Sequence, residues 1–181
     1  MSRHAECPHT LLPRVQRGWE LLDTLDAPDV ASGLRELHRN PTPVVDALGR
    51  FPATLVHGDP KRANVGFRGG RMVLIDWQLA SAQPPAVDLA WLLQSFALVV
   101  TASKETIIAE YRGHLARQLG ARFDDAKWEP QLRLALVGQC LRTMGMWLSE
   151  AHHAPTATAR DMRRAQLPWW CEQARAGLGL L

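Results

Sequence analysis

Long apolar runs and paired cysteines are both missing from this sequence of 181 residues. The most apolar window, residues 89–100, is interrupted by Gln94 and Ser95 and is too short to cross a bilayer, so it predicts a buried helix. The first residues contain no apolar run typical of a signal peptide. The three cysteines share no short spacing, which argues against a disulfide framework and suits a reducing compartment. We therefore expect a cytoplasmic protein that has no membrane partner.

A strong charge of one sign is also absent. The net charge is +3, and the arginines are scattered along the chain. A dispersed basic surface is weak grounds for nucleic-acid binding, so we expect no nucleic-acid partner. The hydrophobic fraction of 46% and the charged fraction of 22% are ordinary for a globular protein, and the length suits one domain.

What the sequence does contain is a cluster of polar residues set between short apolar runs. Asp59 is followed five residues later by Asn64, and Asp76 comes after two further apolar runs. The two runs and the Gly-Gly turn between them predict a β-hairpin formed by Val65–Phe67, Arg68–Arg71 and Met72–Ile75. Because the open ends of a hairpin lie together, we expect Asn64 and Asp76 to be neighbours, with Asp59 on the loop just before them.

These residue types at these spacings are the ones that phosphoryl transfer requires. One carboxylate orients the attacking hydroxyl, while an amide oxygen and a second carboxylate hold Mg²⁺, which neutralises charge on the phosphates. The order of Asp59, Asn64 and Asp76 matches the catalytic-loop and metal-binding signature of kinases. The alternative is that all three are turn formers at strand ends. The agreement of three residue types, two spacings and the strand context favours the catalytic interpretation.

The segments His57–Asp59 and Ile75–Trp77 resemble those of the aminoglycoside phosphotransferase and choline kinase-like family of small-molecule kinases. The close resemblance covers residues 54–92. It implies an α+β, mostly helical fold, the C-terminal lobe of a protein-kinase-like fold, in which a small β-hairpin carries the catalytic and metal-binding loops. The implied site residues are Asp59 as the catalytic base, Asn64 and Asp76 as the metal ligands, and His57 as a support for the catalytic loop.

The same resemblance gives two further residues a role. Asp88, in the segment Pro84–Ala90, is implied to cap a helix and to tie the catalytic loop down. Lys61 follows Asp59 by two residues, which is closer to the protein-kinase arrangement, where such a lysine touches the transferred phosphate. The alternative for Lys61 is an ordinary solvated lysine. Pro60 departs from the family, in which an apolar residue such as leucine is common.

The remaining sequence has helical patterns. They cover residues 11–25, 31–38, 43–48, 88–100, 103–119 and 124–151. A last helix begins at Thr156 or Thr158, reaches about Ala176 and is interrupted near Pro168, and a short strand is expected at 54–56. Ser32 and Ser103 are candidate N-caps, and Gly120 is a candidate helix stop. Trp91, Trp128 and Trp147 have helical spacing with aliphatic partners, which favours core packing over an aromatic cage for a cation.

None of the sequence before residue 54 reads as a Gly-rich phosphate loop, and no strand there carries a lysine that reaches the nucleotide phosphates. By the resemblance, a complete kinase has a nucleotide-binding β-sheet lobe ahead of this point. We therefore expect a single kinase-like helical lobe that lacks the N-terminal nucleotide lobe. Its parts are a helical lead-in (1–53), the catalytic loop, hairpin and metal-binding Asp (54–92), and a helical acceptor-side region (93–181).

We expect a phosphotransferase that moves a phosphoryl group from ATP, or another nucleoside triphosphate, to a hydroxyl of a small molecule with the help of Mg²⁺, and that is incomplete in this chain. The alternative is a non-catalytic kinase-like module that binds a partner, for example a nucleotide-binding lobe on another chain. A third class is a metal-dependent hydrolase using His57, Asp59 and Asp76, although such enzymes normally need more histidines. A cationic acceptor would suit the acidic residues of the later helices, namely Glu105, Glu110, Asp124, Asp125, Glu129 and Glu150.

Overall fold

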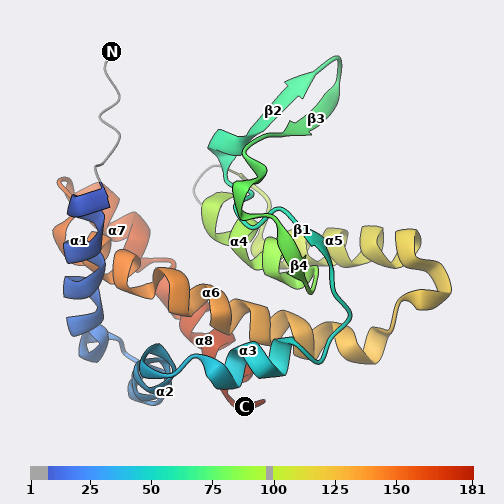
Figure 1. Cartoon of the computed structure of the whole chain (residues 1–181). Coiled ribbons are helices and arrows are strands. Elements are labelled where there is room, and N and C mark those ends of the chain that lie inside the picture. Colours follow the sequence, from blue (N-terminus) through green and yellow to red (C-terminus); the bar gives the residue numbers. More distant parts are fainter. Residues whose placement is uncertain (1–7, 97–99) are drawn as a thin grey trace. The chain divides into compact units, whose positions relative to one another are not determined.

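The computed structural model describes residues 8–96 and 100–181 (Figure 1). The chain forms two compact units. We call Val45–Leu136 the hairpin unit, and Met1–Val44 together with Val137–Leu181 the terminal unit. Helix α6 (Asp125–His153) contributes its beginning to the hairpin unit and its remainder to the terminal unit. The expectation of a mostly helical chain with small antiparallel strands is confirmed.

The hairpin unit contains two separate pairs of short antiparallel strands. They are β1 (Thr54–Val56) with β4 (Ser81–Gln83), and β2 (Val65–Arg68) with β3 (Arg71–Leu74). The second pair is the expected hairpin, in which Val65 lies opposite Leu74. Gly69 and Gly70 have φ angles of 55° and 74°, the left-handed conformation that a two-residue type I′ turn requires at both positions. Strand β4 was not predicted.

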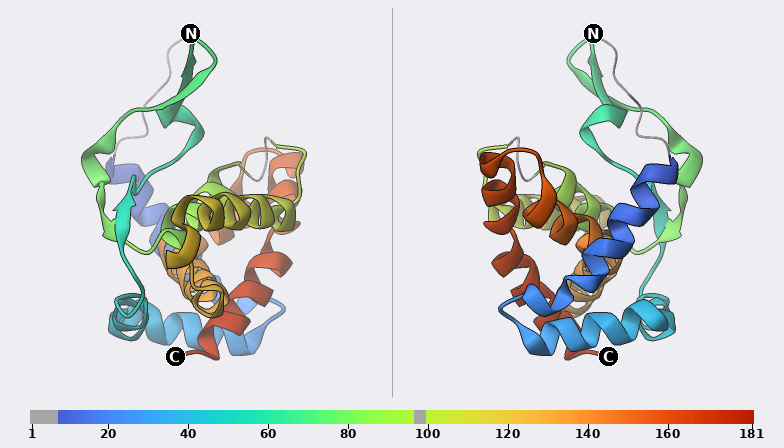
Figure 2. Two further views of the ribbon diagram at one scale, coloured as in Figure 1. Left: turned by 90° about the vertical axis from the view of Figure 1, so that its right-hand side faces the viewer. Right: turned by 90° about the vertical axis from the view of Figure 1, so that its left-hand side faces the viewer.

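The same unit also contains helices. They are α4 (Ala86–Phe96), α5 (Lys104–Leu119), most of α3 (Thr42–Leu48) and the beginning of α6. The side chain of Ser103 caps α5 by accepting the Thr106 N–H at 3.1 Å, and Gly120 ends the helix with a φ of 53°, both as expected. The ring of Tyr111 stacks on that of the buried Trp128 at 6.1 Å between centroids. In all three views the β2–β3 hairpin projects away from α4 and α5 (Figures 1 and 2).

The terminal unit is helical. It contains α1 (Pro8–Glu20), α2 (Pro28–Arg39), α7 (Ala157–Arg164), α8 (Leu167–Leu178) and the remainder of α6. The backbones of α1 and α6 touch, because a Cβ placed on Gly18 would lie 1.5 Å from the carbonyl oxygen of Gly145. The indoles of Trp147 and Trp170 are 4.7 Å apart between centroids, and both are buried. Close helix contact and buried indoles therefore add to the largely aliphatic core of this unit.

Some details of the helical prediction were wrong. Helix α2 begins at Pro28, because proline suits the first helical position, so Ser32 lies inside the helix and is not its cap. The helix expected over 88–100 begins at Ala86 and is described as far as Phe96, since residues 97–99 lie outside the described residues. The burial of Trp128 and Trp147 supports core packing for both, whereas Trp91 is only half-buried.

Short 3-10 turns connect these elements at Leu22–Thr24, Arg62–Asn64, Trp77–Leu79 and Gly120–Arg122. No helix in residues 8–96 or 100–181 is long and apolar enough to cross a membrane.

Candidate active site

Strand β1 leads directly into the segment His57–Asn64, which we call the catalytic loop. Gly58 has a φ of 80°, and a Cβ at this position would lie 2.3 Å from the carbonyl oxygen of Leu79. Both the backbone conformation and the close approach require glycine. The His-Gly-Asp sequence therefore turns the chain sharply at the end of β1.

Asp88, in the first turn of α4, ties this loop to the helix. Its Oδ2 accepts the backbone N–H of His57 at 2.6 Å, and its Oδ1 accepts that of Gly58 at 2.9 Å. Hydrogen bonds to a charged acceptor each contribute about 1.5–3 kcal/mol. The expectation that Asp88 holds the loop down is confirmed, and both carboxylate oxygens serve the loop.

The His57 imidazole is buried and joins two backbone segments. Its Nδ1 accepts the backbone N–H of Asp59 at 3.2 Å, and its Nε2 lies 2.9 Å from the carbonyl oxygen of Ile75. Because a carbonyl only accepts, Nε2 carries the proton and Nδ1 has none, so this network holds a neutral imidazole. The ring also packs on Trp77 at 4.6 Å between centroids. Both nitrogens are occupied by backbone groups, which is the arrangement of a loop support.

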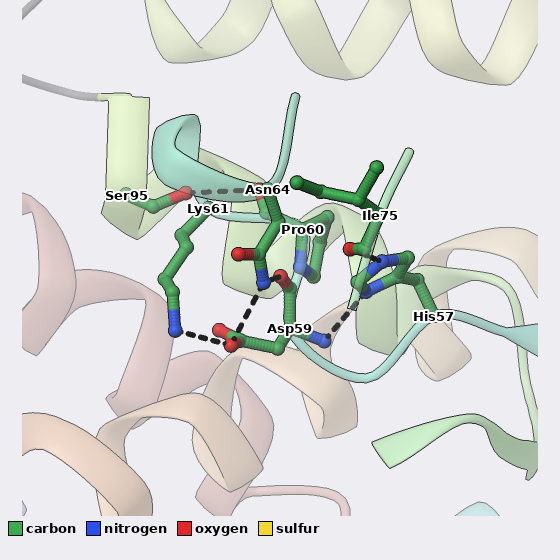
Figure 3. A network of polar contacts seen from close by, with 7 residues as sticks. All are labelled: His57, Asp59, Pro60, Lys61, Asn64, Ile75 and Ser95. Atoms are coloured by element: carbon green, nitrogen blue, oxygen red, sulfur yellow. Dashed lines mark hydrogen bonds and ion pairs between the residues drawn. The ribbon is translucent and has the colours of Figure 1, made fainter. Parts of the chain in front are cut away.

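Asp59, Lys61 and Asn64 form one network of polar contacts (Figure 3). The Asp59 Oδ2 accepts from Lys61 Nζ at 2.5 Å and from Asn64 Nδ2 at 3.1 Å, and Asn64 Nδ2 also donates to the Asp59 carbonyl oxygen at 3.0 Å. Asp59 and Asn64 are buried, whereas the Lys61 side chain is half-exposed. The other carboxylate oxygen, Asp59 Oδ1, is buried and has no hydrogen-bond partner in the described part of the chain.

Asp76 is positioned by the backbone around it. The Ile75 N–H donates to the Asn64 carbonyl oxygen at 3.0 Å, so the residues at the open end of the hairpin lie side by side, as expected. Asp76 has a φ of 68° and is the only residue other than glycine with a positive φ in the described ranges. A non-glycine residue in this conformation marks strain of the kind found at functional sites. Its side chain is exposed and takes no part in the network around Asp59.

Asn64 and Asp76 have the chemistry of a Mg²⁺ site. Because Asn64 Nδ2 is turned toward Asp59, the Oδ1 of the same amide faces away from that carboxylate. An amide oxygen and an exposed carboxylate are hard ligands, and Mg²⁺ is usually held by one or two carboxylates together with substrate phosphates. Residues 8–96 and 100–181 contain no group of three or more His, Cys, Asp or Glu side chains arranged to hold a metal by themselves. These two ligands therefore suit a Mg²⁺ ion that also binds substrate phosphates, and they are too few for a site made of protein side chains alone.

Two contacts of this region were not predicted from the sequence. The Ser95 Oγ lies 3.3 Å from the carbonyl oxygens of both Pro60 and Leu92, so its single hydrogen is shared between the catalytic loop and α4 and gives the loop a second contact with this helix. The Tyr111 hydroxyl donates to the Pro85 carbonyl oxygen at 3.1 Å. Burial, together with the charge of Asp88, raises the pKa of Tyr111 to about 12. Neither residue has a sequence signal, because single hydroxyl groups on helices are common.

The acidic residues considered for a cationic acceptor are mostly paired with basic neighbours. The ion pairs are Asp124 with Lys127, Asp125 with Arg112, Glu129 with Arg133, and Glu150 with Arg163, and a Glu110 carboxylate oxygen lies 3.8 Å from His114 Nε2. The hydrogen bond from Lys127 lowers the pKa of Asp124, as expected for a carboxylate beside a cation. This pairing gives no reason to assign a cationic acceptor.

The comparison with known families agrees with this geometry. A sequence model of the phosphotransferase enzyme family (APH) matches residues 9–130. The chain belongs to this phosphotransferase family. The matched range includes the whole catalytic loop, the hairpin and Asp88, so the kinase-like resemblance of the motif is confirmed at the level of the family. No curated protein and no solved structure matches the chain.

Proposed function

We propose that this member of the phosphotransferase family carries the site at which the γ-phosphoryl group of ATP, or of another nucleoside triphosphate, is transferred to a hydroxyl of a small molecule. The observation that supports this most directly is the unequal environment of the two Asp59 oxygens. Oδ2 is held by Lys61 and Asn64, whereas Oδ1 is buried and accepts no hydrogen bond from the described residues. A buried acceptor without a donor costs about 1–3 kcal/mol, and an incoming hydroxyl supplies that donor.

In this proposal each residue has one task. Asp59 Oδ1 accepts the hydrogen bond of the acceptor hydroxyl and takes its proton as the oxygen attacks the γ-phosphorus, while the bond to the leaving diphosphate breaks. Asn64 Oδ1 and Asp76 would hold Mg²⁺, which when bound neutralises charge on the phosphates. Lys61, half-exposed beside Asp59, steadies the transferred phosphoryl group. His57 and Asp88 position the loop.

The test separates binding from chemistry. Mg²⁺ with ADP is titrated into the wild-type protein, Asp59→Asn and Asp76→Asn, and binding is measured by calorimetry. We expect Asp76→Asn to lose at least roughly tenfold in affinity and Asp59→Asn to retain it, because Asp76 is a proposed ligand of the ion and Asp59 is not. In a transfer assay Asp59→Asn should lose about 10²–10⁴-fold in rate, the usual contribution of a general base. Equal metal affinity in all three proteins would contradict the proposed roles.

The same titration distinguishes a metal-dependent hydrolase. Such an enzyme needs His57 as a ligand, but both ring nitrogens already contact backbone groups. Tight Zn²⁺ binding that is lost in His57→Gln would favour the hydrolase, whereas dependence on Mg²⁺ favours phosphoryl transfer.

A second candidate is a non-catalytic kinase-like module that binds a partner, and the apolar surface around the hairpin favours it. Large apolar side chains are exposed there, from 40% for Val73 to 78% for Phe67. The others are Leu55, Met72, Ile75, Trp77 and Leu79. Exposed apolar side chains gathered in one segment are typical of an interaction surface. The partner we propose is a nucleotide-binding lobe on another chain, and turnover by the purified protein alone separates this candidate from the first.

A further inference from the structure

A pocket of about 310 Å³ lies in the hairpin unit, and none of its lining residues belongs to the catalytic loop. Its walls are mostly apolar and come from the segment before β1, the turn before α4, the end of α5 and the beginning of α6. The apolar lining residues include Pro52, Pro85, Leu115, Leu119 and Phe123. This volume is at the lower end of the range for small-molecule sites.

The side-chain oxygen of Gln131 is a polar atom that lacks a partner. Gln131 of α6 is 7% exposed and lines the pocket, and its Oε1 is buried without a hydrogen bond in the described part of the chain. A buried carbonyl oxygen that accepts nothing is destabilising by about 1–3 kcal/mol. A ligand with an N–H or O–H group in the pocket removes this cost, whereas a purely apolar ligand does not.

The charged residues of the pocket leave one cation unmatched. The Lys127 ammonium lies 3.1 Å from the Asp124 carboxylate, so these two charges neutralise each other. Arg122 also lines the pocket, is exposed, and has no acidic partner in residues 8–96 or 100–181. A guanidinium binds a carboxylate through two parallel hydrogen bonds, which is the strongest pairing open to this residue.

We propose that this pocket binds a small carboxylate that has an apolar body and carries an N–H or O–H donor, the chemistry of an N-acylated apolar amino acid. Its carboxylate pairs with Arg122, its donor group satisfies Gln131 Oε1, and its side chain packs against the apolar walls. The site is additional to the proposed phosphoryl-transfer site and does not depend on it. The two sites share one structural connection, since Thr54 at the pocket begins strand β1, whose other end leads into His57.

The probe is N-acetyl-L-phenylalanine, with binding measured by calorimetry on the full chain. Two matched ligands each remove one feature. N-acetyl-L-phenylalaninamide lacks the carboxylate, and N-acetyl-N-methyl-L-phenylalanine lacks the N–H donor. We expect each matched ligand to bind with roughly threefold to tenfold lower affinity than the probe, because a partly exposed ion pair and a single hydrogen bond each contribute modestly to the binding free energy. Asp59→Asn should bind the probe as the wild type does, so the result is independent of the catalytic proposal.

Two variants assign these losses to named residues. Gln131→Leu should abolish the preference for the N–H ligand over the N-methyl ligand, and Arg122→Gln should abolish the preference for the acid over the amide. Arg68→Gln, on β2 and outside the pocket, is the matched control and should change neither preference. Gln131→Leu removes a buried polar group, so we expect it to fold. The absence of binding at millimolar probe, or preferences that persist in both variants, would overturn the proposal.

Discussion

Tyr111 is the single tyrosine of the chain, so its ionisation is directly visible in the ultraviolet spectrum. Burial and the charge of Asp88 raise its pKa from 10.0 to about 12. The unfolded chain then ionises before the folded protein does. The contribution of Tyr111 to stability is therefore fully present below pH 10 and is lost as the pH rises toward 12.

We expect the phenolate absorbance of the native protein to appear near pH 12, and that of the protein in denaturant near pH 10. The free energy of unfolding should fall by on the order of 2 kcal/mol across this range, and Tyr111→Phe should lack that component of the decrease. At neutral pH the variant loses only the hydrogen bond to Pro85, about 1 kcal/mol. A native titration midpoint near pH 10 would show that the hydroxyl is solvated.

At the residue scale, the sequence predicted which polar residues lie close together but did not predict their hydrogen-bond partners. Asp59 and Asn64 could be predicted to meet because only four loop residues separate them and a hairpin follows. Lys61 contacts Asp59, and the Oε1 of Gln131 accepts no hydrogen bond from the described residues. Both results depend on the directions of side chains, which packing determines. Spacing along the chain does not specify those directions.

The contact between α4 and the catalytic loop gives a prediction at the scale of elements. Asp88→Asn replaces one acceptor oxygen with an NH₂ group, which then faces a backbone N–H of His57 or Gly58. Losing one charge-assisted hydrogen bond should lower the free energy of local opening by about 2 kcal/mol, which corresponds to roughly 30-fold faster amide exchange at these two residues.

The measurement is hydrogen exchange followed by NMR. Asp46→Asn is the matched control, because this exposed carboxylate on α3 has no part in the loop contacts. If the His57 and Gly58 amides exchange at the wild-type rate in Asp88→Asn, the loop is held by other contacts, such as that of Ser95 with Pro60.

Elements with strong local signals were predicted well, and elements made by distant pairing were not. The bounds of β1 and the capped start of α5 agree with the sequence, because an apolar run and a serine cap are local features. Strand β4 has no such signal. Its residues are all exposed, and it exists because Ser81 pairs with Val56, which is far away along the chain.

At the scale of the whole molecule, the division into two units also had no sequence signal. The apolar pattern of α6 continues without a break across the boundary between Leu136 and Val137. The close contact of Gly18 with Gly145, which helps to define the terminal unit, joins residues from opposite ends of the sequence. From the sequence alone, a glycine in a helical pattern indicates lower helix stability, and its role in close packing is apparent only when its distant partner is known.

The two candidate functions make opposite predictions for the whole chain. Orientation and electrostatic positioning supply most of the catalysis in phosphoryl transfer. In residues 8–53 the described elements are helices and turns, and they include no strand that carries a lysine for the nucleotide phosphates. We therefore expect the purified 181-residue protein to transfer phosphate from ATP at least roughly 10³-fold more slowly than a family member with a nucleotide-binding lobe, assayed with the same hydroxyl acceptors. Asp59→Asn is the control for contaminating kinases, since activity that is equal in this variant and in the wild type belongs to another protein. Fast turnover that Asp59→Asn lowers by about 10²-fold or more would instead establish that this chain positions the nucleotide by itself and would exclude the non-catalytic module.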